Sequence, residues 1–91
     1  MYIRKPTRSF KKSLRKILSS GNQKIIEEIE EVIEKLSNNK KLEERFKDHG
    51  LSGELRYFRE CHIRPDLLLI YQISGNELIL AGIGSHSELF G

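Results

Sequence analysis

Hydrophobic positions in the first part of the chain recur with the period of two amphipathic helices. Thr7 and Asn22 stand where the two helices would begin, because both residue types cap helices, and Gly21 stands where the first would end. The two apolar stripes are Phe10, Leu14, Ile17 and Leu18, followed by Ile25, Ile26, Ile29, Val32, Ile33 and Leu36. The short link between them predicts an antiparallel helical hairpin.

The last third of the chain has the shorter period of strands. Residues 67–73 are apolar on both faces and therefore predict a central strand. Turn-forming residues at 64–66 and 74–76 join it to neighbouring strands at residues 56–63 and 77–83. Alternation in the first of these predicts one face with Tyr57, Cys61 and Ile63, and an opposite face with Arg56, Phe58, Glu60 and His62.

Together these elements predict one α+β domain over residues 1–91. A short strand at Tyr2–Lys5, closed by Pro6, precedes the helical hairpin, and the three-strand meander follows it. This order predicts two layers, with the helices on one face of a mainly antiparallel sheet. Residues 40–54 show no strong period, although Leu42 and Phe46 have the spacing of one helical turn. A connection of this length is usually functional or disordered.

Charge is distributed unevenly along the chain. The formal net charge is +3, yet the first twenty residues hold seven basic groups and no acidic one, while the remainder has nine basic and thirteen acidic groups. This asymmetry suggests a polyanion or an acidic protein as partner, and a solvated helix face is the plainer alternative. The basic residues are Arg4, Lys5, Arg8, Lys11, Lys12, Arg15 and Lys16.

Several classes of protein are excluded by composition. A single cysteine, Cys61, rules out an internal disulfide and fits a reducing compartment. The Cys and the three His residues do not have zinc-finger spacing. The longest apolar run, Leu67–Tyr71, is far too short to span a bilayer, and the start of the chain lacks a signal-peptide core. We therefore expect no membrane association and a cytoplasmic location. No glycine-rich phosphate loop or nucleophile elbow is present, and Cys61 is predicted to face the core.

The histidines are the main candidates for chemistry. His62 and Asp66 flank the same predicted turn, and antiparallel pairing brings the end of the last strand, and hence His86, to the same edge of the sheet. His49 lies in the irregular segment. Imidazoles beside a carboxylate are suited to general acid–base catalysis near neutral pH. Each also has a structural explanation: His49 as a surface residue, Asp66 as a turn residue, and His86 as part of a helix cap.

Three blocks of sequence resemble the signature of YafQ-like toxins in the RelE/ParE superfamily. They are Lys47–Gly53 (KDHGLSG), Arg59–Tyr71 (RECHIRPDLLLIY) and Gly84–Phe90 (GSHSELF), in the order and spacing of that family. With the preceding strand and helices, the resemblance covers the whole chain. It implies a RelE-like fold and a ribosome-dependent endoribonuclease that cleaves mRNA in the A site. It also implies neutralisation by an antitoxin, with DNA contacted only through the antitoxin complex, and no cofactor or metal.

The resemblance also assigns residues. The family's important positions match His49, His62, Asp66, His86 and Phe90. RNA supplies its own nucleophile, the 2′-OH, so the protein needs a base, an acid and charge stabilisation at the phosphate. We expect His86 as the acid and His49, His62 and Asp66 as the base and its orienting set.

The chain departs from the family at two places: Leu67 stands where Trp is common, and residues 81–83 lack a basic residue. The stabilising cation is therefore left open among Lys47, Arg56, Arg59 and Arg64. Remaining candidates for RNA contact are Phe58, Phe90, Lys11, Lys12 and Arg15. Two alternatives remain: a ParE-like gyrase inhibitor that is not an enzyme, and an RNA-binding module without catalysis. The histidine blocks favour the nuclease, because gyrase-binding relatives lack them.

Overall fold

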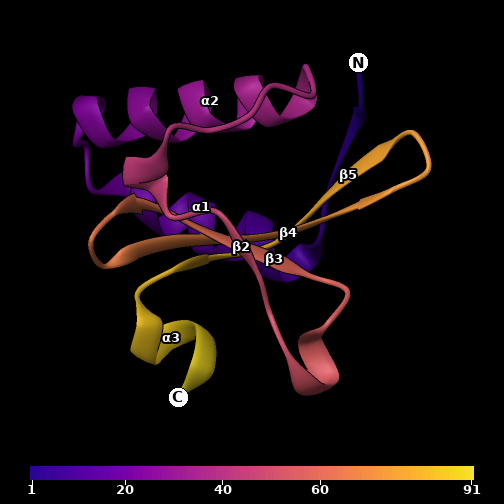
Figure 1. The fold of residues 1–91 in the computed structure, drawn as a ribbon. Coiled ribbons are helices and arrows are strands. Elements are labelled where there is room, and N and C mark those ends of the chain that lie inside the picture. Colours follow the sequence, from indigo (N-terminus) through magenta and orange to yellow (C-terminus); the bar gives the residue numbers. More distant parts are fainter.

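A five-stranded mixed sheet forms the centre of the molecule, with strand order β1-β5-β4-β3-β2 (Figure 1). The computed structural model describes residues 1–91. The strands are β1 (Ile3–Pro6), β2 (His49–Gly50), β3 (Arg59–Arg64), β4 (Leu67–Ser74) and β5 (Glu77–Gly84). β1 runs parallel to β5, and the other neighbouring strands are antiparallel. The predicted meander and the central position of its apolar strand, β4, are confirmed.

Both helices of the predicted hairpin are confirmed with their caps. α1 spans Arg8–Ser19 and α2 spans Gln23–Ser37. The Thr7 hydroxyl accepts a hydrogen bond from the Phe10 backbone N–H at 3.1 Å, and the Asn22 side chain accepts from Ile25 at 3.2 Å. Gly21 links the helices with a φ of +76°, a conformation that favours glycine.

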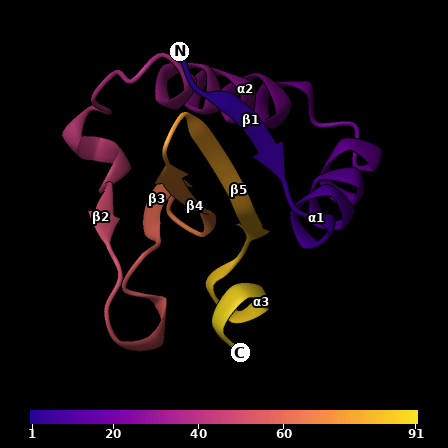
Figure 2. The same cartoon turned by 90° about the vertical axis from the view of Figure 1, so that its right-hand side faces the viewer.

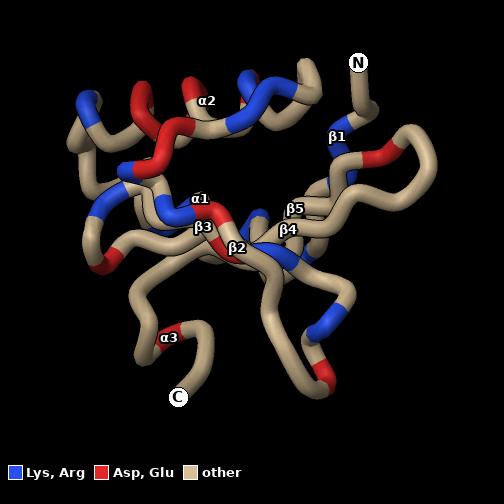
Figure 3. The backbone as a smooth tube through the Cα atoms, viewed as in Figure 1, with Lys and Arg blue, Asp and Glu red and all other residues tan.

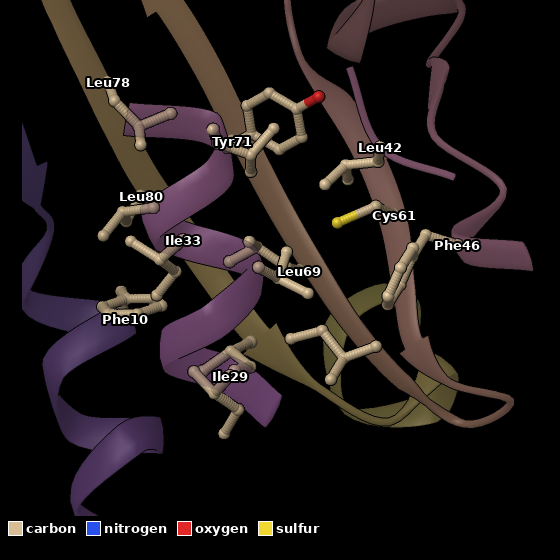
Figure 4. Packing of buried hydrophobic residues seen from close by; sticks show 14 residues of the cluster. Phe10, Ile29, Ile33, Leu42, Phe46, Cys61, Leu69, Tyr71, Leu78 and Leu80 are labelled. Carbon is tan, nitrogen blue, oxygen red and sulfur yellow. The ribbon is translucent and has the colours of Figure 1, made fainter. Parts of the chain in front are cut away.

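One hydrophobic core lies between this helical pair and the sheet (Figure 4). Phe10 of α1 and the predicted stripe of α2 pack against alternate residues of the meander strands, which include Cys61, Leu69, Tyr71, Leu78 and Leu80. Because side chains alternate along a strand, Glu60 and His62 face the other side of the sheet. The core therefore fixes which residues the opposite face presents.

The opposite face carries a third, short helix, α3 (His86–Phe90), on the far side of the sheet from α2 (Figure 1). The predicted capping box opens it: the Ser85 hydroxyl accepts from the Glu88 N–H, and the Glu88 carboxylate accepts from the Ser85 N–H at 2.8 Å. Leu89 packs on Gly82, where an added Cβ would lie 3.1 Å from the Leu89 Cδ2. None of the helices combines the length and the apolar composition needed to cross a bilayer.

The strand predicted for residues 56–63 begins later than expected, at Arg59. A 3₁₀ turn, η2 (Gly53–Leu55), leads into a second turn, so pairing with β4 starts only at Arg59 opposite Tyr71. Tyr57 consequently lies outside the strand with 65% of its surface exposed. The prediction that Tyr57 faces the core beside Cys61 and Ile63 was wrong, whereas both of the latter are buried.

The irregular segment before β3 is packed against the core. Leu42 and Phe46 are buried, and a 3₁₀ turn, η1 (Glu44–Phe46), replaces the predicted helical turn. Lys47 follows in the left-handed conformation with a φ of +48°, and the chain then enters β2 on the flank of the sheet opposite α1 (Figure 2). This path delivers His49 to the outer edge of β3.

Candidate active site

A buried carboxylate, Glu60, lies between two of the three histidines. β2 pairs His49 directly with Glu60, and His62 follows two residues later on the same face of β3. The Glu60 carboxylate lies 3.7 Å from the His49 Nε2 and 3.3 Å from the His62 Nε2. Only 7% of the Glu60 side chain is exposed. A charged group this buried requires partners, and the two imidazoles are placed to supply them.

The contacts of the Nδ1 atoms of His49 and His62 indicate which ring nitrogens carry a proton. The His49 Nδ1 lies 2.6 Å from the Lys47 carbonyl oxygen, and the His62 Nδ1 lies 3.3 Å from that of Pro65. A carbonyl oxygen only accepts hydrogen bonds, so both Nδ1 atoms carry a proton. Each Nε2 therefore faces the Glu60 carboxylate either as a bare acceptor or as part of an imidazolium. The His62 Nε2 lies close enough to the Glu60 carboxylate to form an ion pair with it when the ring is protonated.

The backbone of the third histidine, His86, is held by the side chain of Asp66. The Asp66 carboxylate accepts a hydrogen bond from the backbone N–H of His86 at 3.0 Å. This bond joins the β3–β4 turn to the start of α3, which lie at one edge of the sheet because Leu68 pairs with Gly84. The His86 ring lies against Phe90, with their centroids 5.0 Å apart. Asp66 forms no hydrogen bond with His49 or His62 and fixes the backbone of His86 instead, while Glu60 is the carboxylate beside those two imidazoles.

The four candidate cations have different surroundings. Arg59 bonds to Asp48, and Arg64 bonds to Glu28 at 2.7 Å. Arg56 stacks over the exposed ring of Tyr57. Lys47 forms no ion pair and lines a hollow of about 300 Å³ together with His62 and Arg64. Lys47 is therefore the free cation next to the imidazoles.

The two candidate aromatic residues come together near α3. Phe58 and Phe90 line a hollow of about 250 Å³ whose other walls include Ile70, Gly82 and Leu89. Phe58 precedes β3 rather than lying within it. The mostly apolar lining of this hollow suits a nucleobase.

The basic residues of α1 form a separate surface. Arg8, Lys11, Lys12 and Arg15 line an open groove of about 510 Å³ with no acidic residue in it, and none of them forms an ion pair. Acidic residues gather instead on α2, at the top of the molecule and on the far side of the sheet from α3 (Figure 3). The predicted asymmetry of charge along the sequence is thus also an asymmetry in space.

Burial and hydrogen bonds raise the pKa values of three further groups near the site. Burial raises the pKa of the Cys61 thiol to about 12, so the thiol stays protonated and is no nucleophile. The pKa of Tyr71 is raised, chiefly by burial and next by its hydrogen bond with Asp48. The pKa of Arg59 is raised chiefly by its hydrogen bond with the Tyr71 hydroxyl.

Sequence reasoning missed Glu60, Asp48 and Tyr71 as parts of this region. Glu60 and His62 stand two positions apart on one predicted strand face, which was the available signal for a carboxylate beside an imidazole. No local signal connects Asp48 with Tyr71, because they are 23 residues apart in the chain.

Comparison with known proteins identifies relatives over the full chain. Residues 2–91 match the family described as a bacterial toxin of type II toxin–antitoxin system, YafQ. The mRNA interferase toxin YafQ of Escherichia coli (strain K12) is 36% identical over 56 residues, which span 62% of this chain and 61% of that relative. The match thus covers about three-fifths of the length of that curated protein.

Two solved structures share the whole fold. A copper-bound mutant toxin from Helicobacter pylori is 42% identical with a TM-score of 0.89, and covers 99% of this chain and 100% of its own. The E. coli DinJ–YafQ complex contains a chain that is 27% identical with a TM-score of 0.86, and both chains are covered completely.

The copper in the H. pylori structure raises the question of whether this chain is built for a metal. No group of three or more His, Cys, Asp or Glu side chains is arranged to hold a metal ion here.

Proposed function

The chain belongs to the YafQ family of bacterial type II toxins, and from this we propose that it is an endoribonuclease that cleaves mRNA in the ribosomal A site. The arrangement of Glu60 between His49 and His62, with His86 held by Asp66 at the same end of the sheet, carries the proposal. The E. coli relative is named an mRNA interferase, which agrees with this chemistry.

His49 is the proposed base. Its Nδ1 proton is engaged with the Lys47 carbonyl, so the Nε2 lone pair is the one that can accept a proton. About half of the side chain, 51%, is exposed and open to substrate. When it takes the proton of a ribose 2′-OH, the resulting imidazolium lies beside the Glu60 carboxylate. The 2′ oxygen then attacks the adjacent phosphorus.

His86 is the proposed acid. The 5′ oxygen leaves as its bond to phosphorus breaks, and the His86 ring donates a proton to it, which produces a 2′,3′-cyclic phosphate and a free 5′-OH. Asp66 binds the backbone of His86 rather than its ring, so the ring stays free to face the substrate. Each such proton transfer contributes roughly 10²–10⁴ to the rate.

Charge on the phosphate is balanced by His62 and Lys47. A protonated His62 is a cation beside Glu60, and Lys47 lines the same hollow without an ion pair. Such preorganised cations stabilise the negative charge that grows in the transition state. Phe58 and Phe90 stack neighbouring bases, and the groove of α1 binds ribosomal or messenger phosphate in the cytoplasm.

An antitoxin is the proposed protein partner. The structural relative from E. coli is described as a DinJ–YafQ toxin–antitoxin complex. By analogy, an antitoxin would cover this chain, and contact with DNA would occur only through that complex.

The decisive test is to express the chain from a tightly controlled promoter and map the 5′ ends of cellular mRNA. We expect cuts in register with codons, and none from a folded His86→Ala variant. Intact mRNA with inhibited DNA gyrase would instead support the ParE-like alternative. RNA binding without new 5′ ends would support a module without catalysis.

A further inference from the structure

A closed group of three hydrogen-bonded side chains lies behind His49. The Tyr71 hydroxyl donates to the Asp48 carboxylate at 2.6 Å. The Arg59 Nε lies 3.2 Å from the same carboxylate oxygen and 3.3 Å from the Tyr71 hydroxyl oxygen. Tyr71 is only 1% exposed and its ring is part of the hydrophobic core. Asp48, which precedes His49 in the chain, is thus bound to the centre of the sheet.

The segment that carries His49 has few other attachments. β2 consists of two residues paired with the outer edge of β3. Lys47 has a φ of +48°, a conformation that costs free energy for a residue with a Cβ and persists only where its surroundings impose it. Asp48 lies directly between this strained residue and His49. Its bond to Tyr71 therefore holds both neighbours in place.

The strained conformation has a chemical consequence. It directs the Lys47 carbonyl toward the His49 ring, where the Nδ1 lies 2.6 Å away. The partner of one imidazole nitrogen decides which tautomer the ring adopts. With Nδ1 protonated by this contact, the Nε2 lone pair is presented at the surface beside Glu60. If Lys47 relaxed, its carbonyl would turn away and either nitrogen could carry the proton.

We propose that Tyr71 is a positioning residue for His49, acting through Asp48 and Arg59 to maintain the ring's Nδ1–H tautomer. The link to RNA cleavage rests on the function proposed above, whereas the link to the tautomer does not. Tyr71 lies in the core and contacts no substrate, so its hydroxyl acts only through the segment it anchors.

The test removes one oxygen atom. Tyr71→Phe keeps the ring in the core and deletes the donor to Asp48, while Tyr57→Phe is the matched control on an exposed tyrosine. Long-range ¹H–¹⁵N spectra of the purified chain report the tautomer of each histidine. We expect His49 to be an Nδ1–H tautomer in the wild type and in Tyr57→Phe, and a mixture in Tyr71→Phe, with His86 unchanged.

Cleavage provides the second readout. Because misplacement of a catalytic group slows chemistry, Tyr71→Phe should lower kcat by roughly ten- to a hundredfold and leave KM near wild type. Asp48→Asn keeps an oxygen acceptor for the Tyr71 hydroxyl, so it should retain more of the tautomer and of kcat than Asp48→Ala.

A folded Tyr71→Phe protein with an unchanged His49 tautomer would overturn the proposal, whether or not the chain cuts RNA. If Tyr71→Phe does not fold, Asp48→Ala decides in its place, and an unchanged tautomer there has the same meaning. If Tyr71→Phe shifts the His49 tautomer but the wild-type chain does not cleave mRNA, the proposed function is refuted and the anchoring role of Tyr71 stands.

Discussion

Replacing Glu60 by Gln tests the centre of the site, because it removes one charge and almost no volume. Glu60 lies 3.3 Å from the His62 Nε2 and 3.7 Å from the His49 Nε2. At an effective dielectric constant of about 20, two unit charges separated by the shorter distance, 3.3 Å, interact by about 5 kcal/mol. This is an upper limit, because His49 is half exposed and water screens its part of the interaction.

The retained side chain compensates for part of that loss, since an amide can still bond to an imidazole. We take about half of the upper limit as the net cost to the transition state, which corresponds to a rate decline of about a hundredfold. The decline should appear in kcat, because the imidazolium at His49 forms only during proton transfer. Binding of RNA and of the antitoxin should stay near wild type.

Single-turnover cleavage on ribosomes loaded with a defined codon is the suitable assay, with thermal melting as the check on folding. Glu54→Gln, on an exposed turn, removes the same charge away from the histidines and should cleave normally. A folded Glu60→Gln protein with wild-type kcat would show that the carboxylate does not stabilise the imidazolium, and would refute the assignment of His49 as base.

Four further results follow from the structure. His86→Ala should slow cleavage by at least about a hundredfold and abolish growth arrest. Its melting temperature and antitoxin binding should stay close to wild type. A folded variant that still cuts mRNA would refute the assignment of His86 as the acid. Ile29→Asp places a charge at a site that is 3% exposed and should unfold the domain, as loss of the cooperative melt would show. Because burial raises the pKa of the Cys61 thiol to about 12, a thiol reagent at mildly alkaline pH should label the chain only as fast as it unfolds; rapid labelling of folded protein would contradict this. Changing four basic residues of α1 to Gln should make the salt dependence of RNA binding shallower; the residues are Lys11, Lys12, Arg15 and Lys16. An unchanged log–log slope would show that the helix does not contact RNA.

The elements that the sequence predicted well are those with a repeating pattern. The stripe of α2 and the two-faced apolar strand β4 follow from periods that the core enforces, because each residue must face the helices or the opposite side of the sheet. Tyr57 is a residue whose environment this pattern predicted wrongly. The alternation in the sequence includes Tyr57, but β3 pairs with β4 only from Arg59 onward. A residue outside the paired strand is not held on either face of the sheet.

The partners of the charged residues were less predictable. Asp66 was expected beside His62 because both flank one turn, yet its carboxylate bonds to the start of α3. The burial of Glu60 could not be predicted from the sequence, because an acidic residue is rarely buried without a partner. Its partner His49 comes from β2, a strand too short to produce a periodic pattern. Such contacts depend on pairings between distant segments, which a local pattern does not contain.

The missing basic residue at the end of β5 has a structural explanation that bears on the mechanism. Gly82 faces the side of the sheet that carries α3, and Leu89 occupies the space where its side chain would begin, with only 3.1 Å to an added Cβ. A side chain at Gly82 would therefore require the end of the Leu89 side chain to move. The packing therefore disfavours a basic residue at Gly82, and we propose that the charge comes from the other side of the site. His62, beside the Glu60 carboxylate, and the unpaired Lys47 both lie there. Gly82 thus permits the close packing of α3 on β5, and this packing agrees with the proposed cationic role of β3 and its neighbouring turn.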